Sequence, residues 1–191
     1  MKRFVLSCVL AGALAAPAWA ALNAGESAPD FHAQASFAGK AMPYSLKDAL
    51  KKGPVVVYFY PSAYTNACNV QAQAFAVRSE KFAAAGASII GVSLDSIARL
   101  NEFSADPEYC NGKFPVASDA NGRIAKSYDL SVKQARAGMK DTRGGDIDHD
   151  LAERTTFIVS PDGKIAATVG GMSPTSNVEK ALEAVQSLGA R

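Results

Sequence analysis

Apolar runs and helically spaced apolar positions alternate along most of the chain. Residues 55–60 (VVVYFY) and 87–94 (ASIIGVSL) are apolar runs rich in β-branched side chains, which is typical of strands buried on both faces. Residues 154–159 (RTTFIV) form a third such run, followed by the turn SPDG. We expect residues 164–169 to return antiparallel after that turn, and residues 114–117 to add a short strand.

A helical spacing of apolar residues replaces this pattern between the strands. The longest helix is predicted over residues 63–85. Its buried face is expected to carry the spaced apolar residues Val70, Ala74, Val77 and Phe82. Shorter helices are predicted over residues 45–51, 96–105, 121–128 and 176–188. Ser45 and Ser176 are expected to cap the first and the last of these helices, because a serine side chain can accept from a free backbone N–H.

Strands that alternate with helices, followed by a terminal hairpin and helix, predict an α/β fold. The sheet should be mixed, with helices on both of its faces. The sequence has no internal repeat and no low-complexity tract. We therefore expect residues 21–191 to form a single domain.

The segment 131–153 gives the weakest structural signal. It is rich in glycine and aspartate, and we interpret it as an exposed loop. The aspartates near His149 raise the alternative of a cation site, but their spacing matches no EF-hand pattern. A solvated loop is the favoured interpretation, because charged runs usually face water.

The N-terminus has the pattern of an export signal. Lys2 and Arg3 are followed by an apolar stretch over residues 4–16 and then by the small-residue cleavage pattern AWA. The apolar stretch is too short to span a bilayer comfortably, although a retained membrane anchor is the alternative. We expect residues 1–20 to be a cleaved signal peptide and the mature chain to begin at Ala21. The expected location is the periplasm, with secretion as the other possibility.

Composition and charge narrow the function classes. Of the 191 residues, 48% are hydrophobic and 20% are charged, which is typical of a soluble globular protein. The formal net charge is +2, with lysine and arginine scattered along the chain, so no nucleic-acid partner is expected. The two histidines, His32 and His149, lie far apart and suggest no metal site. No phosphate-binding or dinucleotide-binding glycine motif is present, so no cofactor is expected.

The cysteines give the chain its candidate chemistry. Cys8 would leave with the signal peptide, so the mature chain keeps Cys68 and Cys110. Two cysteines in an exported protein suggest a structural disulfide. The absence of a C-x-x-C pair counts against a disulfide exchanger of the thioredoxin type.

Cys68 has the sequence context of a nucleophile. It follows the apolar run at 55–60 and lies near the start of the long predicted helix. Free N–H groups and the positive dipole end at a helix N-terminus stabilise a thiolate, which is the reactive form of cysteine. Pro61 can fix the exit of the chain from the strand, and Thr65 brings a hydroxyl for a substrate oxygen. The alternative is that Cys68 is a core residue of a binding domain.

These residues resemble a known family. The pattern Pro61-x-x-x-Thr65-x-x-Cys68 is similar to the active-site motif of the peroxiredoxins, which are thiol-dependent peroxidases with a thioredoxin-like fold in the AhpC/TSA superfamily. The segment GESAPDF at residues 25–31 also resembles that family, and Arg154 matches its distal arginine. The resemblance is to the bacterioferritin-comigratory, or Q, group in particular.

The resemblance implies a role for each of these residues. Cys68 would attack a peroxide and become a sulfenic acid. Arg154 would keep the thiolate charged and polarise the peroxide, Thr65 would hydrogen-bond it, and Pro61 would limit the access of water. Thr65 as a plain helix cap and Arg154 as a surface ion-pair partner are the structural alternatives. Gln71 stands where many relatives carry a glutamate, and we expect this difference to tune the site.

Cys110 is expected to be the resolving cysteine, which would attack the Cys68 sulfenic acid and form an intrachain disulfide. The resemblance to the Q group also implies a resolving cysteine five residues after the first as an option, but that position is Gln73 here, so the local pairing is excluded. An inert buried cysteine and a permanent structural bridge remain as alternatives for Cys110.

The expected partners are a peroxide substrate and a thioredoxin-like or other dithiol reductant. No membrane contact is expected after signal removal, and the chain would be a monomer or a homodimer. The competing function is a redox-sensing or interaction protein of the same fold, in which oxidation of Cys68 signals to a partner.

Overall fold

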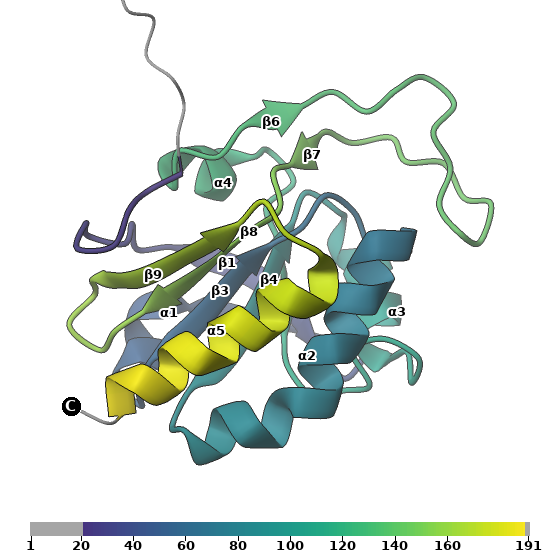
Figure 1. Ribbon diagram of the computed structural model, residues 1–191. Helices are drawn as coiled ribbons and strands as arrows, with labels where there is room; N and C mark the ends of the chain where they lie inside the picture. The colour runs from purple at the N-terminus through teal and green to yellow at the C-terminus, as the bar shows by residue number, and fades with distance from the viewer. Residues whose placement is uncertain (1–20, 190–191) are drawn as a thin grey trace, which may run out of the picture.

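The computed structural model describes residues 21–189 (Figure 1). The predicted signal peptide at residues 1–20 lies outside the described part of the chain. A seven-stranded sheet has the order β2-β1-β5-β4-β3-β8-β9. Its strands are β1 (His32–Phe37), β2 (Lys40–Ser45), β3 (Val55–Phe59), β4 (Ser88–Ser93), β5 (Val116–Ser118), β8 (Thr155–Val159) and β9 (Ile165–Gly170).

The sheet is mixed, as the sequence predicts. Strand β3 runs parallel to β4, and β4 runs parallel to β5. Strand β8 is antiparallel to both β3 and β9, which confirms the predicted hairpin. All five residues of β3 are buried, because the strand lies inside the sheet and helices cover both faces.

Five helices lie within residues 21–189: α1 (Leu46–Leu50), α2 (Asn66–Ala84), α3 (Ile97–Ala105), α4 (Arg123–Ser127) and α5 (Pro174–Gly189). Buried residues form two hydrophobic clusters. One contains side chains of α2, α3 and α5, and the other contains side chains of α1 and α4. Figure 1 shows α2 and α5 side by side on one face of the sheet. The α/β class with helices on both faces is therefore confirmed.

The predicted buried face of the long helix is partly wrong. Ala74 and Phe82 are buried as expected, but Val70 is 46% exposed and Val77 is 75% exposed. The helix packs through small and aromatic side chains such as Phe75, which stacks on the ring of Tyr58 in β3 at 4.5 Å between centroids. Since α2 contacts both the sheet and α5, the buried stripe is set by those two neighbours rather than by its valines.

The helix ends also differ from the prediction. Helix α2 begins at Asn66, and residues 63–65 form a turn. Ser45 caps α1 as expected, accepting from the Asp48 N–H. At the start of α5, however, Ser173 accepts from the Ser176 N–H at 3.3 Å, so the predicted cap Ser176 lies inside the helix.

The hairpin of β1 and β2 was missed because β2 is an exposed edge strand with little apolar patterning. A second, two-stranded sheet pairs β6 (Val132–Lys133) with β7 (Leu151–Ala152) and closes the base of the loop over residues 134–150. Among the described residues, no helix combines the length and the apolar character needed to cross a bilayer.

Candidate active site

Cys68 lies where the central strand gives way to the long helix. Strand β3 ends at Phe59, and residues 60–65 turn into α2. Cys68 is in the first turn of that helix, and it is only 2% exposed. The thiol is therefore shielded from bulk water yet close to the free N–H groups of the helix start.

The turn before the helix is held in an unusual conformation. Tyr64 has a φ of 60°, in the left-handed region, which is strained for a residue with a side chain. Thr65 occupies the N-cap position without making a capping bond, and its hydroxyl donates instead to the Ser62 carbonyl at 2.9 Å. The oxygen of Thr65 thus keeps lone pairs free to accept from another group.

Arg154 reaches the thiol from the neighbouring strand. The register pairs Phe59 at the end of β3 with Thr155 at the start of β8, so the residue before β8 lies beside the β3 exit. The Arg154 Nη2 donates to the Cys68 Sγ at 3.1 Å. Within residues 21–189 Arg154 forms no ion pair with a carboxylate, so the surface ion-pair alternative is wrong.

The same guanidinium has a second partner. The Arg154 Nη1 donates to the Gln71 Oε1, one turn further along α2 than Cys68. Gln71 is fully buried. Arg154 therefore bridges two residues of α2, and this contact fixes its orientation over the thiol. Pro61 is half-buried between β3 and the turn, and its predicted role as a shield remains a prediction.

Cys110 is buried in a different segment. It follows α3, is completely inaccessible, and is a free thiol like Cys68. Burial raises the pKa of the Cys110 thiol, and the nearby Asp106 carboxylate raises it further. While it stays in this environment, Cys110 is protonated at neutral pH and is a poor nucleophile.

A cluster of buried charged side chains contacts the turn at residues 60–65. Asp95, just after β4, is fully buried and accepts from the Ala63 N–H at 2.8 Å and from the Ser93 hydroxyl at 2.7 Å. Arg99 lies 2.9 Å from Asp95 through its Nε and 2.6 Å from Asp141 through its Nη2. The side chains of β4, α3 and the 134–150 loop thus hold the backbone of the turn at residues 60–65, which leads into α2 and Cys68.

His149 completes this cluster, in a site that favours its charged form. Its Nε2 lies 2.9 Å from the Asp95 Oδ1, and its Nδ1 lies 2.8 Å from the Asp150 carbonyl oxygen. Both ring nitrogens therefore face acceptors, and only the imidazolium can donate to both. Burial disfavours the charge, but the hydrogen bond and the negative charge of Asp95 outweigh it, so the pKa of His149 is raised.

The solvated-loop interpretation of residues 131–153 is consequently wrong in part. Asp141 and Ile147 are buried, and Thr142 donates through both its N–H and its hydroxyl to the Tyr64 carbonyl at 2.8 Å. The Arg143 guanidinium lies 3.3 Å from the centre of the Tyr64 ring. Sequence spacing could not reveal these contacts, although an aspartate directly after a buried strand was a usable signal for Asp95.

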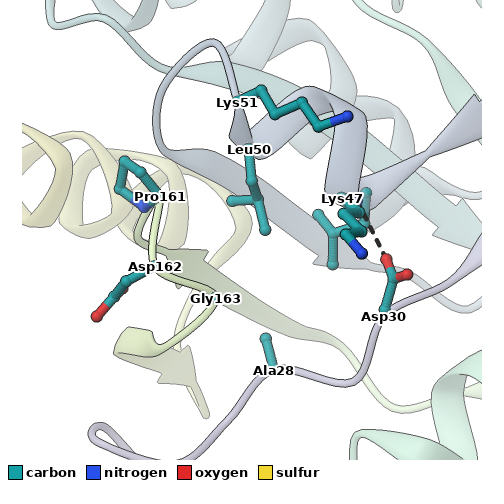
Figure 2. A pocket seen from close by; sticks show the side chains of 9 residues that line it. Ala28, Asp30, Lys47, Leu50, Lys51, Pro161, Asp162 and Gly163 are labelled. Atoms are coloured by element: carbon teal, nitrogen blue, oxygen red, sulfur yellow. Dashed lines mark hydrogen bonds between the residues drawn. The ribbon is translucent and has the colours of Figure 1, made fainter.

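A separate cavity of about 490 Å³ opens between α1 and the β8–β9 turn. Figure 2 shows Lys47 and Lys51 on one side of it and Pro161 on the other, with the Lys47 backbone N–H donating to Asp30. Its apolar lining belongs to the α1 face of the sheet, whereas Cys68 belongs to the α2 face. This cavity is therefore not part of the thiol site. Within residues 21–189, no cluster of three potential metal ligands is present.

Comparison with known proteins shows the family to which the chain belongs. Residues 24–168 match the model of the AhpC/TSA family. The chloroplastic 2-Cys peroxiredoxin BAS1 of Hordeum vulgare is 28% identical over 169 residues, which cover 86% of this chain and 74% of that protein. Peroxiredoxin Bcp of Xanthomonas campestris is 32% identical over 111 residues, which cover 58% of this chain and 62% of that protein.

Among solved structures, peroxidoxin BcpB from Mycobacterium tuberculosis superimposes with a TM-score of 0.72 at 27% identity, covering 87% of this chain and 98% of that chain. Peroxiredoxin Q of Xanthomonas campestris gives a TM-score of 0.69 at 26% identity, covering 87% of this chain and 99% of that chain. The fold is thus thioredoxin-like and the protein is a thiol peroxidase. The chain belongs to the AhpC/TSA family, as a peroxiredoxin of the Bcp/Q group.

Proposed function

We propose that Cys68 is the peroxidatic residue. Its thiolate attacks one oxygen of hydrogen peroxide or an organic hydroperoxide, the O–O bond breaks, and the sulfur becomes a sulfenic acid. The departing oxygen takes up a proton and leaves as water or an alcohol. The observation that carries this proposal is the 3.1 Å contact between the Arg154 Nη2 and the Cys68 Sγ at the start of α2.

The surrounding groups have complementary roles in this step. Arg154 stabilises negative charge on the sulfur and then on the departing oxygen, because a guanidinium stays cationic at any ordinary pH. The Thr65 hydroxyl already donates to the Ser62 carbonyl, so it accepts a hydrogen bond from the peroxide O–H. Free N–H groups at the start of α2 add to the stabilisation of the developing charge. Pro61 limits the access of water.

In the second step, Cys110 resolves the intermediate. Its thiol attacks the Cys68 sulfenic acid, the S–O bond breaks, and one water leaves as the disulfide forms. An external dithiol, thioredoxin-like or of another kind, then reduces that disulfide and is itself oxidised. Both cysteines are buried in the structure, so this step includes opening of the two segments that carry them.

Intact-mass analysis tests both steps. After one equivalent of peroxide, the wild-type protein is expected to lose two hydrogens as the disulfide forms. Cys110→Ser is expected to gain one oxygen and to gain more with excess peroxide, while Cys68→Ser is expected to gain none and to lose turnover with a dithiol reductant.

Unchanged turnover by Cys68→Ser would remove the proposal for Cys68. Unchanged turnover and no over-oxidation in Cys110→Ser would remove only the resolving step and would leave Cys110 as an inert cysteine. The second outcome leaves the first step standing, because the first oxidation needs only one thiol.

We also propose that the protein works in the periplasm, as a monomer or a homodimer. The basic residues, apolar stretch and AWA pattern of residues 1–20 support export. Fractionation of cells that produce the full chain is expected to find the protein outside the cytoplasm. Its mass is expected to be that of a chain beginning at Ala21. A cytoplasmic protein that keeps residues 1–20 would contradict this.

A further inference from the structure

A buried chain of side-chain hydrogen bonds extends away from the thiol site. The Arg154 Nη1 donates to the Gln71 Oε1, and the Gln71 Nε2 donates to the Asn177 Oδ1 at 3.0 Å. The Asn177 Nδ2 then donates to the Val169 carbonyl at 3.0 Å, and the Thr156 hydroxyl donates to the Asn177 Oδ1 at 2.6 Å. Gln71, Thr156 and Asn177 are each at most 1% exposed.

The chemistry at its two ends fixes the direction of this chain. A guanidinium can only donate, so Gln71 must present its oxygen to Arg154 and its NH₂ to Asn177. At the other end a backbone carbonyl can only accept, so Asn177 must present its NH₂ to Val169 and its oxygen to Gln71. Both requirements give the same orientation for the two amides. Each amide is therefore fixed in one orientation, because flipping either one would place a buried donor against a donor or a buried acceptor against an acceptor.

The chain of bonds also joins separate elements to the thiol site. Gln71 belongs to α2, Val169 to β9 and Asn177 to the first turns of α5. Helix α5 thereby reaches the Arg154 guanidinium through one intermediate residue. It does so with neutral groups only, and within the described residues no carboxylate pairs with Arg154. The positive charge of Arg154 is left for the sulfur of Cys68.

We propose that Gln71 and Asn177 are positioning residues that aim the Arg154 guanidinium at Cys68 without neutralising it. Gln71 fixes one end of the guanidinium, and Asn177 fixes Gln71 from α5. This inference rests on the proposed role of Cys68 as the reacting thiol. These two neutral amides orient the Arg154 guanidinium and, unlike a carboxylate, leave its positive charge unpaired.

Two substitutions separate orientation from charge. In Gln71→Glu, a carboxylate would meet the guanidinium and neutralise it, and its second oxygen would face the Asn177 Oδ1. In Asn177→Leu, the amide partner of Gln71 would be lost while no charge is added. Gln73→Glu is the matched control, because Gln73 is on the same helix but is exposed. It introduces the same charge where solvent screens it.

The measurement is the rate at which iodoacetamide alkylates Cys68 as a function of pH. The full chain is used, and the Cys68 peptide is followed by mass spectrometry so that other cysteines do not contribute. For Gln71→Glu the half-maximal rate is expected about one pH unit higher than in the wild type, so that alkylation below that range slows about tenfold. Asn177→Leu is expected to lower kcat/KM for peroxide and to move the profile in the same direction by less. Gln73→Glu is expected to match the wild type.

The outcomes separate the inference from the function beneath it. Wild-type profiles in both Gln71→Glu and Asn177→Leu, with peroxide turnover intact, would overturn the positioning roles and leave the peroxidase proposal standing. A shift in Gln71→Glu alone would remove Asn177 from the assignment. A wild-type Cys68 that stays unoxidised by peroxide would remove the proposed function itself. Circular dichroism confirms folding, and either variant alone tests the inference should the other fail to fold.

Discussion

At the scale of the residue, Cys68 is subject to opposing effects. Its burial disfavours a charged sulfur, because a charge in a poorly solvated site lacks the stabilisation that water gives. The helix start and the Arg154 guanidinium favour the charge, since both place donors or positive potential at the sulfur. Arg154 makes its contact from the strand beside β3 and is held by a second bond to Gln71. In the proposed mechanism, the orientation of this guanidinium therefore controls the reactivity of Cys68.

Arg154→Lys should show how much of the stabilisation of charge on Cys68 requires the planar, bidentate guanidinium. A lysine keeps the positive charge but cannot span Cys68 and Gln71 in the fixed geometry of a guanidinium. We expect kcat/KM for peroxide to fall about ten- to hundredfold, which is about 1.4 to 2.7 kcal/mol of transition-state stabilisation. Steady-state peroxide consumption with excess dithiol measures it.

Arg78→Lys is the matched control for this substitution. Arg78 also belongs to an α2–α5 contact, pairing with Glu179 at 2.9 Å, but it does not touch Cys68. We expect its kcat/KM to equal that of the wild type. Equal activity of Arg154→Lys and the wild type would mean that a point charge suffices at this position.

The sequence pattern pointed to Cys68, which follows a strongly patterned strand and lies near the start of the long helix. Arg154 was predicted only from the resemblance to the peroxiredoxins, at the start of the run RTTFIV. The contact between the Gln71 and Asn177 amides could not be predicted from the sequence. Gln71 and Asn177 meet only because α5 packs on α2, and nothing in the spacing of the sequence encodes that contact. The sequence showed that Gln71 replaces the glutamate of many relatives, but it did not show that Asn177 would be its hydrogen-bond partner.

At the scale of the element, the 134–150 loop supports the turn at residues 60–65, which leads into α2 and Cys68. Asp141 pairs with Arg99, His149 pairs with Asp95, and Asp95 holds the Ala63 N–H. Opposite charges thus alternate through the cluster, which offsets the cost of burying each of them. Because His149 is the only member that titrates near neutral pH, this support should depend on pH.

The sign of that dependence follows from the pKa of His149. Burial alone would lower the pKa, but the hydrogen bond and charge of Asp95 outweigh burial and raise it above the usual value. A raised pKa means that the stabilising pair is fully present below about pH 6.5, the ordinary value for histidine. The stabilisation is then lost as the pH rises through the higher pKa of the folded state. Arg99, which also faces Asp95, opposes the rise.

His149→Gln should therefore destabilise the protein mainly at low pH. We expect its free energy of unfolding to be about 1 to 2 kcal/mol below that of the wild type near pH 6, with the difference shrinking towards pH 9. Urea unfolding at a series of pH values measures it. His32→Gln is the control, because His32 is exposed on β1, and a His149→Gln deficit that is constant with pH would contradict the imidazolium assignment.

The elements that the sequence predicted well are those with strong apolar patterns. Strands β3, β4 and β8 were found because they are buried on both faces, whereas β2 was missed because it is exposed at the edge of the sheet. The 134–150 loop was misjudged for a related reason. Its contacts are made by charged side chains, which a pattern-based interpretation assigns to solvent.

At the scale of the whole molecule, the two cysteines share one hydrophobic cluster on the α2 face of the sheet. The aromatic rings beside them are in contact: Tyr64 and Tyr109 lie edge to face at 5.7 Å, and Phe103 packs against both. Backbone bonds fix each segment further, including the Cys110 carbonyl, which accepts from the Lys113 N–H at 2.9 Å. We therefore expect the proposed disulfide between the two thiols to form with loss of this local packing.

Oxidation of the wild-type protein should therefore loosen two separate segments together. Disulfide geometry requires the two Cα atoms to lie within roughly 4.4–6.8 Å and the two sulfurs to face one another. Since both thiols are buried and free in the structure, we expect the first turn of α2 and the segment after α3 to give up native hydrogen bonds when the proposed disulfide forms. Hydrogen exchange followed by mass spectrometry is expected to show faster exchange over residues 62–70 and 106–112 after one equivalent of peroxide. Residues 165–170 of β9 serve as the internal reference and are expected to be unchanged. Cys110→Ser is expected to show no faster exchange in these segments, because its oxidised form has no disulfide. A disulfide in the wild-type protein with unaltered exchange in both segments would mean that the thiols pair without opening of the segments.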